Sequence, residues 1–151
     1  MALLSHSQKS DAGNASIEFI AAGALLLVPI VYLIVTMAVI QGAQLAAASA
    51  ARQAARVFVQ APDLASAQAA AQRAVDFAFA DHRIDPRTAV VRVTCLPHPT
   101  QCLTPLGTVT VHVSVAPSLP LVPRALTGQG STGGTLSSSA SQQVSKFWGS
   151  W

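Results

Sequence analysis

The sequence predicts an α+β protein built from one long helix, one short helix and a small sheet. The long N-terminal transmembrane helix continues into an Ala-rich helix, and the sheet is antiparallel with two to three strands. Three observations lead to this prediction. An apolar run near the N-terminus is long enough to cross a bilayer. Ala-rich segments with helical periodicity follow it, and β-branched residues alternate with polar ones further along the chain.

The predicted membrane span runs from Phe19 to Ile40, and Thr36 is its only polar interruption. As a helix, these roughly 22 residues rise about 33 Å, which covers the hydrocarbon core of a bilayer. Pro29 removes one backbone hydrogen bond in mid-span, so we expect a helix kink there. The apolar core of a secretory signal peptide is only roughly 7–15 residues long. A retained anchor is therefore favoured over cleavage in the small-residue tract at 46–50.

Charge counting leaves the orientation of this span undecided, because Lys9 on one side is balanced by Arg52 and Arg56 on the other. Both cysteines of the chain, Cys95 and Cys102, follow the span. Their spacing in an exported segment suggests a local disulfide, with two free thiols as the alternative in a reducing compartment. The cysteines favour a cytoplasmic N-terminus and an extracytoplasmic C-terminal region.

Two Ala-rich helices are predicted after the span. In the segment from Gln41 to Val59, alanines recur every four residues along one face (Ala43, Ala47, Ala51 and Ala55). This stripe indicates either close helix packing or simply the high helix propensity of alanine. Pro62 is expected to end this helix and Asp63 to cap a second one, which reaches Arg83. Its predicted buried stripe is Leu64, Ala67, Ala71, Val75 and Ala78, with Phe77 and Phe79 supplying most of the bulk.

The β-region begins where the period changes from helical to alternating. We predict strands at Ala89–Cys95 and Thr108–Val115, and Thr135–Ser141 is the candidate for a third, edge strand. The valines of the second strand point one way, and its polar residues, including His112, point towards solvent. The Pro- and Gly-rich segment 116–134 is interpreted as a flexible loop. The C-terminal aromatic residues suit either a partner surface or a frayed terminus.

The rest of the sequence carries no pattern typical of an enzyme or of a cofactor site. It contains no Gly-rich phosphate loop, no paired carboxylates and no Cys–His pair in helical register. His98 and His112 add too few ligands to the cysteines for a metal site. Lys and Arg total 9 and are scattered, whereas a nucleic-acid surface requires clustered basic residues. We therefore expect a non-enzymatic protein with no cofactor, no metal and no nucleic-acid partner.

One motif remains, GNASIEF, in which Gly13 precedes Asn14 and the chain's sole glutamate, Glu18, precedes Phe19. It resembles the processing signal of type IV pilin-like proteins, which a prepilin-type membrane peptidase cuts after glycine. From Gly13 to Arg56 the chain resembles more closely the TadE-like family of tight-adherence (Flp) pilus pseudopilins. The β-region with its cysteine pair is similar to that of actinobacterial members. The leader departs from the family pattern because it lacks a strong basic cluster.

The resemblance implies a domain order and a role. Residues 1–13 would be a leader peptide, 14–60 the transmembrane and extended helix, and 61–151 a small extracytoplasmic α+β region. Cleavage after Gly13 would create an amine at Asn14, about one helical turn from the acid of Glu18, which registers subunits in a filament. The expected function is that of a minor pilin-like membrane subunit in assembly of a tight-adherence pilus or related secretion system. Its implied partners are the lipid bilayer, the peptidase, other pilin or pseudopilin subunits and pilus assembly proteins.

Two other functions are compatible with the sequence. An uncleaved single-span protein could bind another envelope protein through its exported region, and a secreted protein could be released by cleavage near residue 50.

Overall fold

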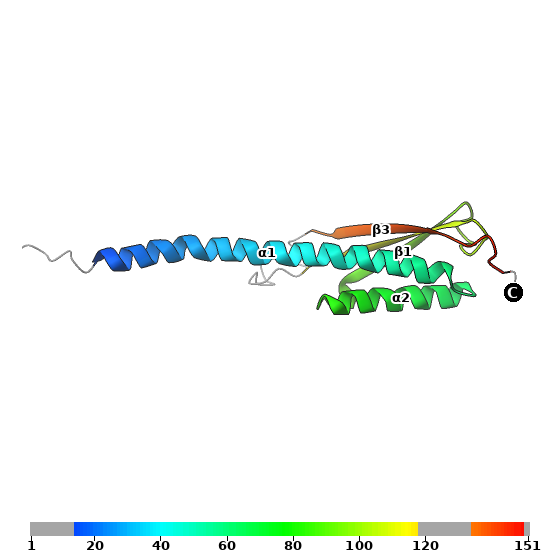
Figure 1. The fold of residues 1–151 in the computed structure, drawn as a ribbon, viewed down its shortest axis with the longest axis horizontal. Coiled ribbons are helices and arrows are strands. Elements are labelled where there is room, and N and C mark those ends of the chain that lie inside the picture. Colours follow the sequence, from blue (N-terminus) through cyan, green and yellow to red (C-terminus); the bar gives the residue numbers. More distant parts are fainter. Residues whose placement is uncertain (1–13, 118–133, 150–151) are drawn as a thin grey trace, which may run out of the picture. The chain divides into compact units, whose positions relative to one another are not determined.

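The computed structural model describes residues 14–117 and 134–149 (Figure 1). The helices are α1 (Asn14–Val59), α2 (Leu64–Asp81) and a 3₁₀ helix, η2 (Pro86–Thr88). The strands are β1 (Ala89–Leu96), β2 (Thr108–Val115) and β3 (Leu136–Gln143). These elements confirm the predicted α+β class. The predicted leader, Gly13 and most of the predicted 116–134 loop lie outside the described residues.

The chain divides into two compact units, Met1–Thr36 and Met37–Trp151, and the boundary falls inside α1. The Ala-rich half of α1 therefore belongs to the same unit as α2 and the sheet. We call this second unit the head.

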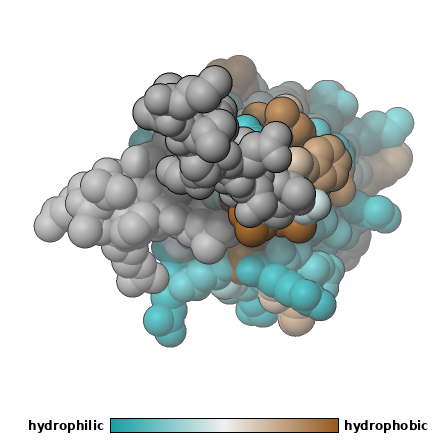
Figure 2. Space-filling model, turned by 90° about the vertical axis from the view of Figure 1, so that its left-hand side faces the viewer, coloured by the Kyte–Doolittle hydropathy of each residue, from teal (hydrophilic) through white to brown (hydrophobic). Residues whose placement is uncertain are grey.

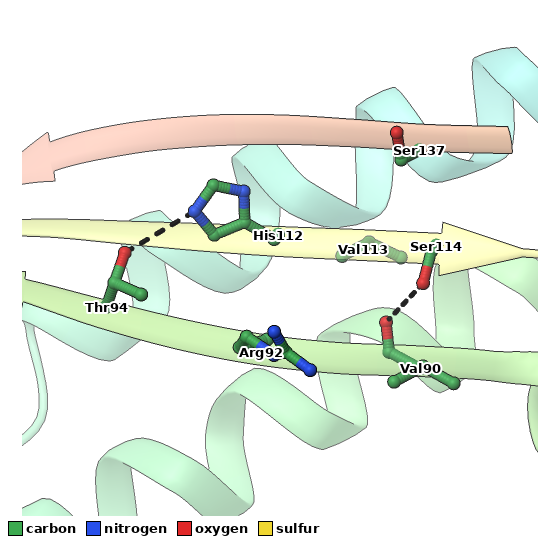
Figure 3. A pocket seen from close by; sticks show the side chains of 7 residues that line it. All are labelled: Val90, Arg92, Thr94, His112, Val113, Ser114 and Ser137. Carbon is green, nitrogen blue, oxygen red and sulfur yellow. Dashed lines mark hydrogen bonds between the residues drawn. The ribbon is translucent and has the colours of Figure 1, made fainter.

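The sheet of the head has strand order β1-β2-β3, with both neighbouring pairs antiparallel. Val113 of β2 lies opposite Val91 of β1 and Ser138 of β3. β2 alternates as predicted, since its four valines are buried and His112 is exposed. The third strand is present at the predicted place and continues to Gln143. Both helices lie behind one face of the sheet in Figure 3. The opposite face carries exposed residues, among them Arg92 and His112, and we call it the open face.

The core of the head is built around the alanines of α1. Phe58 and seven alanines of this helix are almost completely buried, namely Ala43, Ala46, Ala47, Ala50, Ala51, Ala54 and Ala55. All four alanines of the predicted stripe are among them. Because alanine carries only a methyl group, a helix face made of it can approach its neighbours closely. These alanines form one core cluster with the valines of β2 and the buried residues of α2, so their role includes packing as well as helix propensity.

α2 begins where the sequence predicts, directly after Asp63. Asp63 is the N-cap, and its Oδ1 accepts a hydrogen bond of 2.8 Å from the Ser66 backbone N–H. The Ser66 hydroxyl donates to Oδ2 at 2.7 Å. These bonds favour the charged carboxylate, so they hold the pKa of Asp63 below its usual value. Asp63 thereby satisfies a backbone donor that the first helical turn would otherwise leave unpaired.

The predicted buried stripe of α2 needs two corrections. Ala67, Ala71, Val75 and Ala78 are buried as expected. Phe79 is fully buried, but Phe77 is 70% exposed, so it adds little to the core. Phe79 follows Val75 by one turn, whereas Phe77 is two residues away and points to another side of the helix. Leu64, at the first position of α2, is 42% exposed.

The connection between β1 and β2 is closed by the expected disulfide between Cys95 and Cys102, whose Cα atoms are 5.1 Å apart. Gly107 ends this connection, and a Cβ there would lie 2.8 Å from the Thr104 hydroxyl and 3.0 Å from its carbonyl oxygen. The Gly107 carbonyl accepts a hydrogen bond of 2.8 Å from the N–H of Val144, just after β3. The lack of a side chain therefore lets the loop turn tightly and join the end of the sheet.

The C-terminal segment is not frayed at Trp148. The indole packs against the core, and its Nε1–H donates a hydrogen bond of 3.0 Å to the carbonyl of Ala61, between the two helices. The expectation of a frayed terminus is therefore wrong for this residue. Trp151 lies outside the described residues.

Candidate functional site

The first candidate site is the surface of α1 within the N-terminal unit. Its large apolar side chains are exposed, for example Leu25 at 82% and Leu33 at 63%. None of the residues in its most apolar 18-residue window is buried. Brown, hydrophobic side chains are visible on the surface in Figure 2. Among the residues that the structure describes, one helix is thus long and apolar enough to span a membrane.

The predicted processing motif begins this helix. Asn14 is the first residue of α1, and Glu18 and Phe19 follow within the same continuous helix. The side chains of Glu18 and Phe19 are exposed, the latter at 80%. The rise of about 1.5 Å per residue places the backbone of Glu18 about 6 Å along the axis from that of Asn14. Gly13, the residue before the predicted cleavage point, lies outside the described residues.

The helix itself provides a hydrogen-bond partner for a polar side chain in the apolar part of α1. The Thr36 hydroxyl donates a hydrogen bond of 2.8 Å to the carbonyl of Tyr32, so it is satisfied without water. Pro29 lies inside α1, which continues on both sides of it. A kink at Pro29 stays a prediction.

The positions of these polar residues follow a pattern that sequence reasoning missed. An α-helix has 3.6 residues per turn, so 18 residues make about five complete turns. Glu18 and Thr36 therefore lie on the same side of the helix, and Asn14 and Tyr32 each precede one of them by about one turn. The signal was the 18-residue spacing between Glu18, just before the apolar run, and Thr36 inside it. This spacing gives the apolar half of α1 a polar side.

The head contributes a disulfide and an open, polar sheet face. Arg52 and Arg56 of α1 are exposed. Within residues 14–117 and 134–149, no group of three or more His, Cys, Asp or Glu side chains is arranged to hold a metal ion. The open sheet face carries a shallow depression, which includes His112.

Comparisons of this chain with protein-family models, with curated proteins and with solved structures found no match.

Proposed function

We propose that the protein is a pilin-like membrane subunit, processed after Gly13 and retained in the membrane by α1. The observation that carries this proposal is the composition of α1 along its length. This one helix starts at Asn14, directly after Gly13, and contains Glu18, a long unburied apolar surface and then the alanines of the head core. A helix of this kind serves both as an anchor and as part of a folded domain.

The unburied apolar surface supports the membrane assignment. Soluble monomers rarely expose contiguous apolar patches above a few hundred Å². A lipid environment removes the cost of exposing Leu25, Leu33 and their neighbours. The Thr36–Tyr32 hydrogen bond also suits a medium in which water is absent.

The position of Glu18 supports the proposed processing. A charged side chain costs about 2.5–3.5 kcal/mol at the centre of a membrane helix and less towards the interface. Cleavage after Gly13 produces an ammonium group on Asn14, about one turn from the Glu18 carboxylate, in the same subunit or beside that of a neighbour. Opposite charges at this spacing offset part of the cost of placing the acid beside lipid.

The polar side of the span supports assembly with other subunits. Polar groups in membrane helices face protein more often than lipid. Glu18, Tyr32 and Thr36 share one side of α1 and define the face that would meet another pilin or pseudopilin helix. The disulfide of the head agrees with an extracytoplasmic C-terminal region, because disulfides persist in oxidising compartments.

N-terminal sequencing of the protein extracted from membranes tests the proposal. We expect the mature chain to begin at Asn14 when a prepilin-type peptidase is co-expressed, and at Met1 or Ala2 when it is absent. A Gly13→Leu variant should stay uncleaved, because a bulky side chain replaces the hydrogen of glycine at the bond to be cut.

Gly23→Leu is the matched control, since it makes the same change further along α1, where a Cβ would meet no atom within 4 Å. It should be processed like the natural chain. Identical N-termini for the natural chain with and without peptidase would contradict the proposal and favour the uncleaved single-span protein. A chain beginning near residue 50 would favour the secreted protein.

A further inference from the structure

The face of the sheet that the helices leave open is a second surface with its own chemistry. A shallow depression of about 460 Å³ lies on it. Its lining comes from all three strands and combines two valines with five polar residues: Val90, Arg92, Thr94, His112, Val113, Ser114 and Ser137. We call these seven residues the open-face site.

The register of the strands brings its two nitrogen-bearing side chains together. Arg92 of β1 and His112 of β2 are directly opposite each other, and both are exposed. The Oγ1 of Thr94 lies 3.4 Å from Nε2 of His112, which holds the imidazole towards β1. Figure 3 shows this contact. Arg92 and His112 thus form adjacent positions for hydrogen bonds to one ligand.

The hydroxyl groups around Arg92 and His112 retain donor and acceptor positions with which they can bind a ligand. The Ser114 hydroxyl donates a long bond of 3.4 Å to the Val90 carbonyl. His112 also lies opposite Ser139 of β3, whose side chain faces the same way. A hydroxyl offers one donor and two acceptor positions. The site therefore presents one guanidinium and one imidazole among hydroxyls, without a large aromatic side chain.

The charge of Arg92 is uncompensated on this face. The four carboxylates of the head, Asp63, Asp76, Asp81 and Asp85, lie on α2 or in the turns beside it. Among the described residues, Arg92 forms no ion pair and the open-face site contains no acid. The sequence of 118–133 cannot supply one either, because its sole charged residue is Arg124. An anionic ligand would therefore complement the charge of Arg92.

We propose that the open-face site binds an acidic polysaccharide whose sugars carry carboxylates, such as a polyuronate. Arg92 receives the carboxylate through two parallel hydrogen bonds, the geometry that a guanidinium fork provides. His112 and the surrounding hydroxyls bind the sugar hydroxyls. One arginine among hydroxyls matches a polymer with about one charge per sugar, whereas nucleic acid or polyphosphate requires several clustered cations. The proposal concerns the head alone and does not depend on processing at Gly13.

Binding of the full chain in detergent micelles or nanodiscs to alginate tests the proposal, with neutral dextran and inorganic polyphosphate as comparison polymers. We expect alginate to bind and dextran not to bind. Arg92→Gln should weaken alginate binding roughly tenfold, because a charged hydrogen-bonded contact is lost. Ser137→Tyr should also weaken it, by filling the depression. Both residues are exposed, and circular dichroism checks that the variants keep the fold.

Arg73→Gln is the matched control, since Arg73 is an exposed arginine on α2, outside the open-face site. It should leave alginate affinity within about twofold of the natural chain. Equal losses in Arg92→Gln and Arg73→Gln would overturn the proposal in favour of general attraction to a basic protein. Failure to bind alginate would also overturn it, as would equal or tighter binding of dextran or polyphosphate. If the extracted chain begins at Met1 and still binds alginate through Arg92, the proposed processing is wrong but this inference holds.

Discussion

The two halves of α1 are both rich in apolar residues, yet the first half exposes them and the second half buries them. The first half carries the larger side chains, including Phe19 and Leu25, and exposes them. The second half carries mostly alanine and buries seven of these residues almost completely. Hydropathy alone would assign the bulky half to a core and the alanine half to the surface. The contrast teaches that burial along this helix does not follow hydropathy, since the alanines are packed in the core while the larger apolar side chains of the first half are exposed.

Physical chemistry accounts for this reversal. In the head, a wide alanine face lets α1 pack tightly in a core whose bulk comes from Val75, Phe79 and the valines of β2. In lipid, large aliphatic side chains on the outside cost nothing, because the medium is as apolar as they are. Four predictions test this comparison, from the largest effect to the smallest.

Shortening one phenylalanine in each half should have very different results. Phe58→Ala removes a side chain that is 1% exposed, and it should lower the free energy of unfolding of the head by about 3–5 kcal/mol. Phe19→Ala should leave this free energy unchanged, since Phe19 is 80% exposed. Thermal unfolding of the full chain in detergent, followed by circular dichroism, measures both. Equal losses would contradict the comparison.

An added charge should be tolerated in the second half of α1 but not in the first, which is the reverse of the result expected for shortening a phenylalanine. Leu26→Arg puts a cation on the apolar surface of the first half and should cost about 2.5–3.5 kcal/mol of membrane insertion. We expect a reduced fraction of the protein to resist alkaline extraction from membranes. Gln53→Arg, at an exposed position of the second half, is the control and should remain anchored. Complete retention of Leu26→Arg would argue against lipid around this half.

Enlarging an alanine should be tolerated in the first half only. Ala50 is fully buried, so Ala50→Leu overfills the core and should destabilise the head by about 1–3 kcal/mol. Ala22→Leu makes the same change at an exposed position of α1 and should leave the melting temperature of the head as it is. If Ala50→Leu were neutral, the alanine face would not be tightly packed.

The smallest effect concerns the helix cap that Asp63 forms in the head. The pKa of Asp63 is lowered by hydrogen bonds from Ser66, so the carboxylate stabilises the fold at any pH above the pKa that Asp63 has in the unfolded chain. This contribution is lost as the pH falls through the lower, folded pKa. The stability difference between the natural chain and Asp63→Ala should therefore narrow in acid. Asp63→Asn keeps an uncharged acceptor, so its cap should not depend on pH; a constant difference for Asp63→Ala would contradict the role of the charge.

Local signals predicted most of the fold. Pro62 and Asp63 marked the junction of the helices because their chemistry acts on adjacent backbone. The alternation of valines with polar residues in β2 predicted which face of the strand is buried, since successive side chains of a strand point to opposite sides. The disulfide could be anticipated because Cys95 and Cys102 are close in sequence. The extent of apolar residues predicted a helix able to span a membrane.

What escaped prediction depends on packing between distant parts of the chain. Phe77 and Phe79 look equivalent in sequence, and only their position relative to Val75 on α2 separates them. Trp148 finds its partner 87 residues away at Ala61, a distance at which no local pattern operates. The pairing of Arg92 with His112 likewise required the register of β1 and β2. Sequence identified His112 as solvated, but not the arginine beside it.

The bond between Trp148 and Ala61 also bears on when the head can fold during synthesis. β2 is the central strand, and its second neighbour, β3, follows it in the sequence, as do the core residues Val144 and Trp148. A polypeptide that emerges from its N-terminus can form α1, α2 and the β1–β2 pair first, but one edge of β2 stays unpaired until β3 is available. Long-range contacts of this kind slow folding and expose apolar surface in the meantime. A nascent chain that stops before β3 therefore has a two-stranded sheet with one open edge on β2, where another strand can pair.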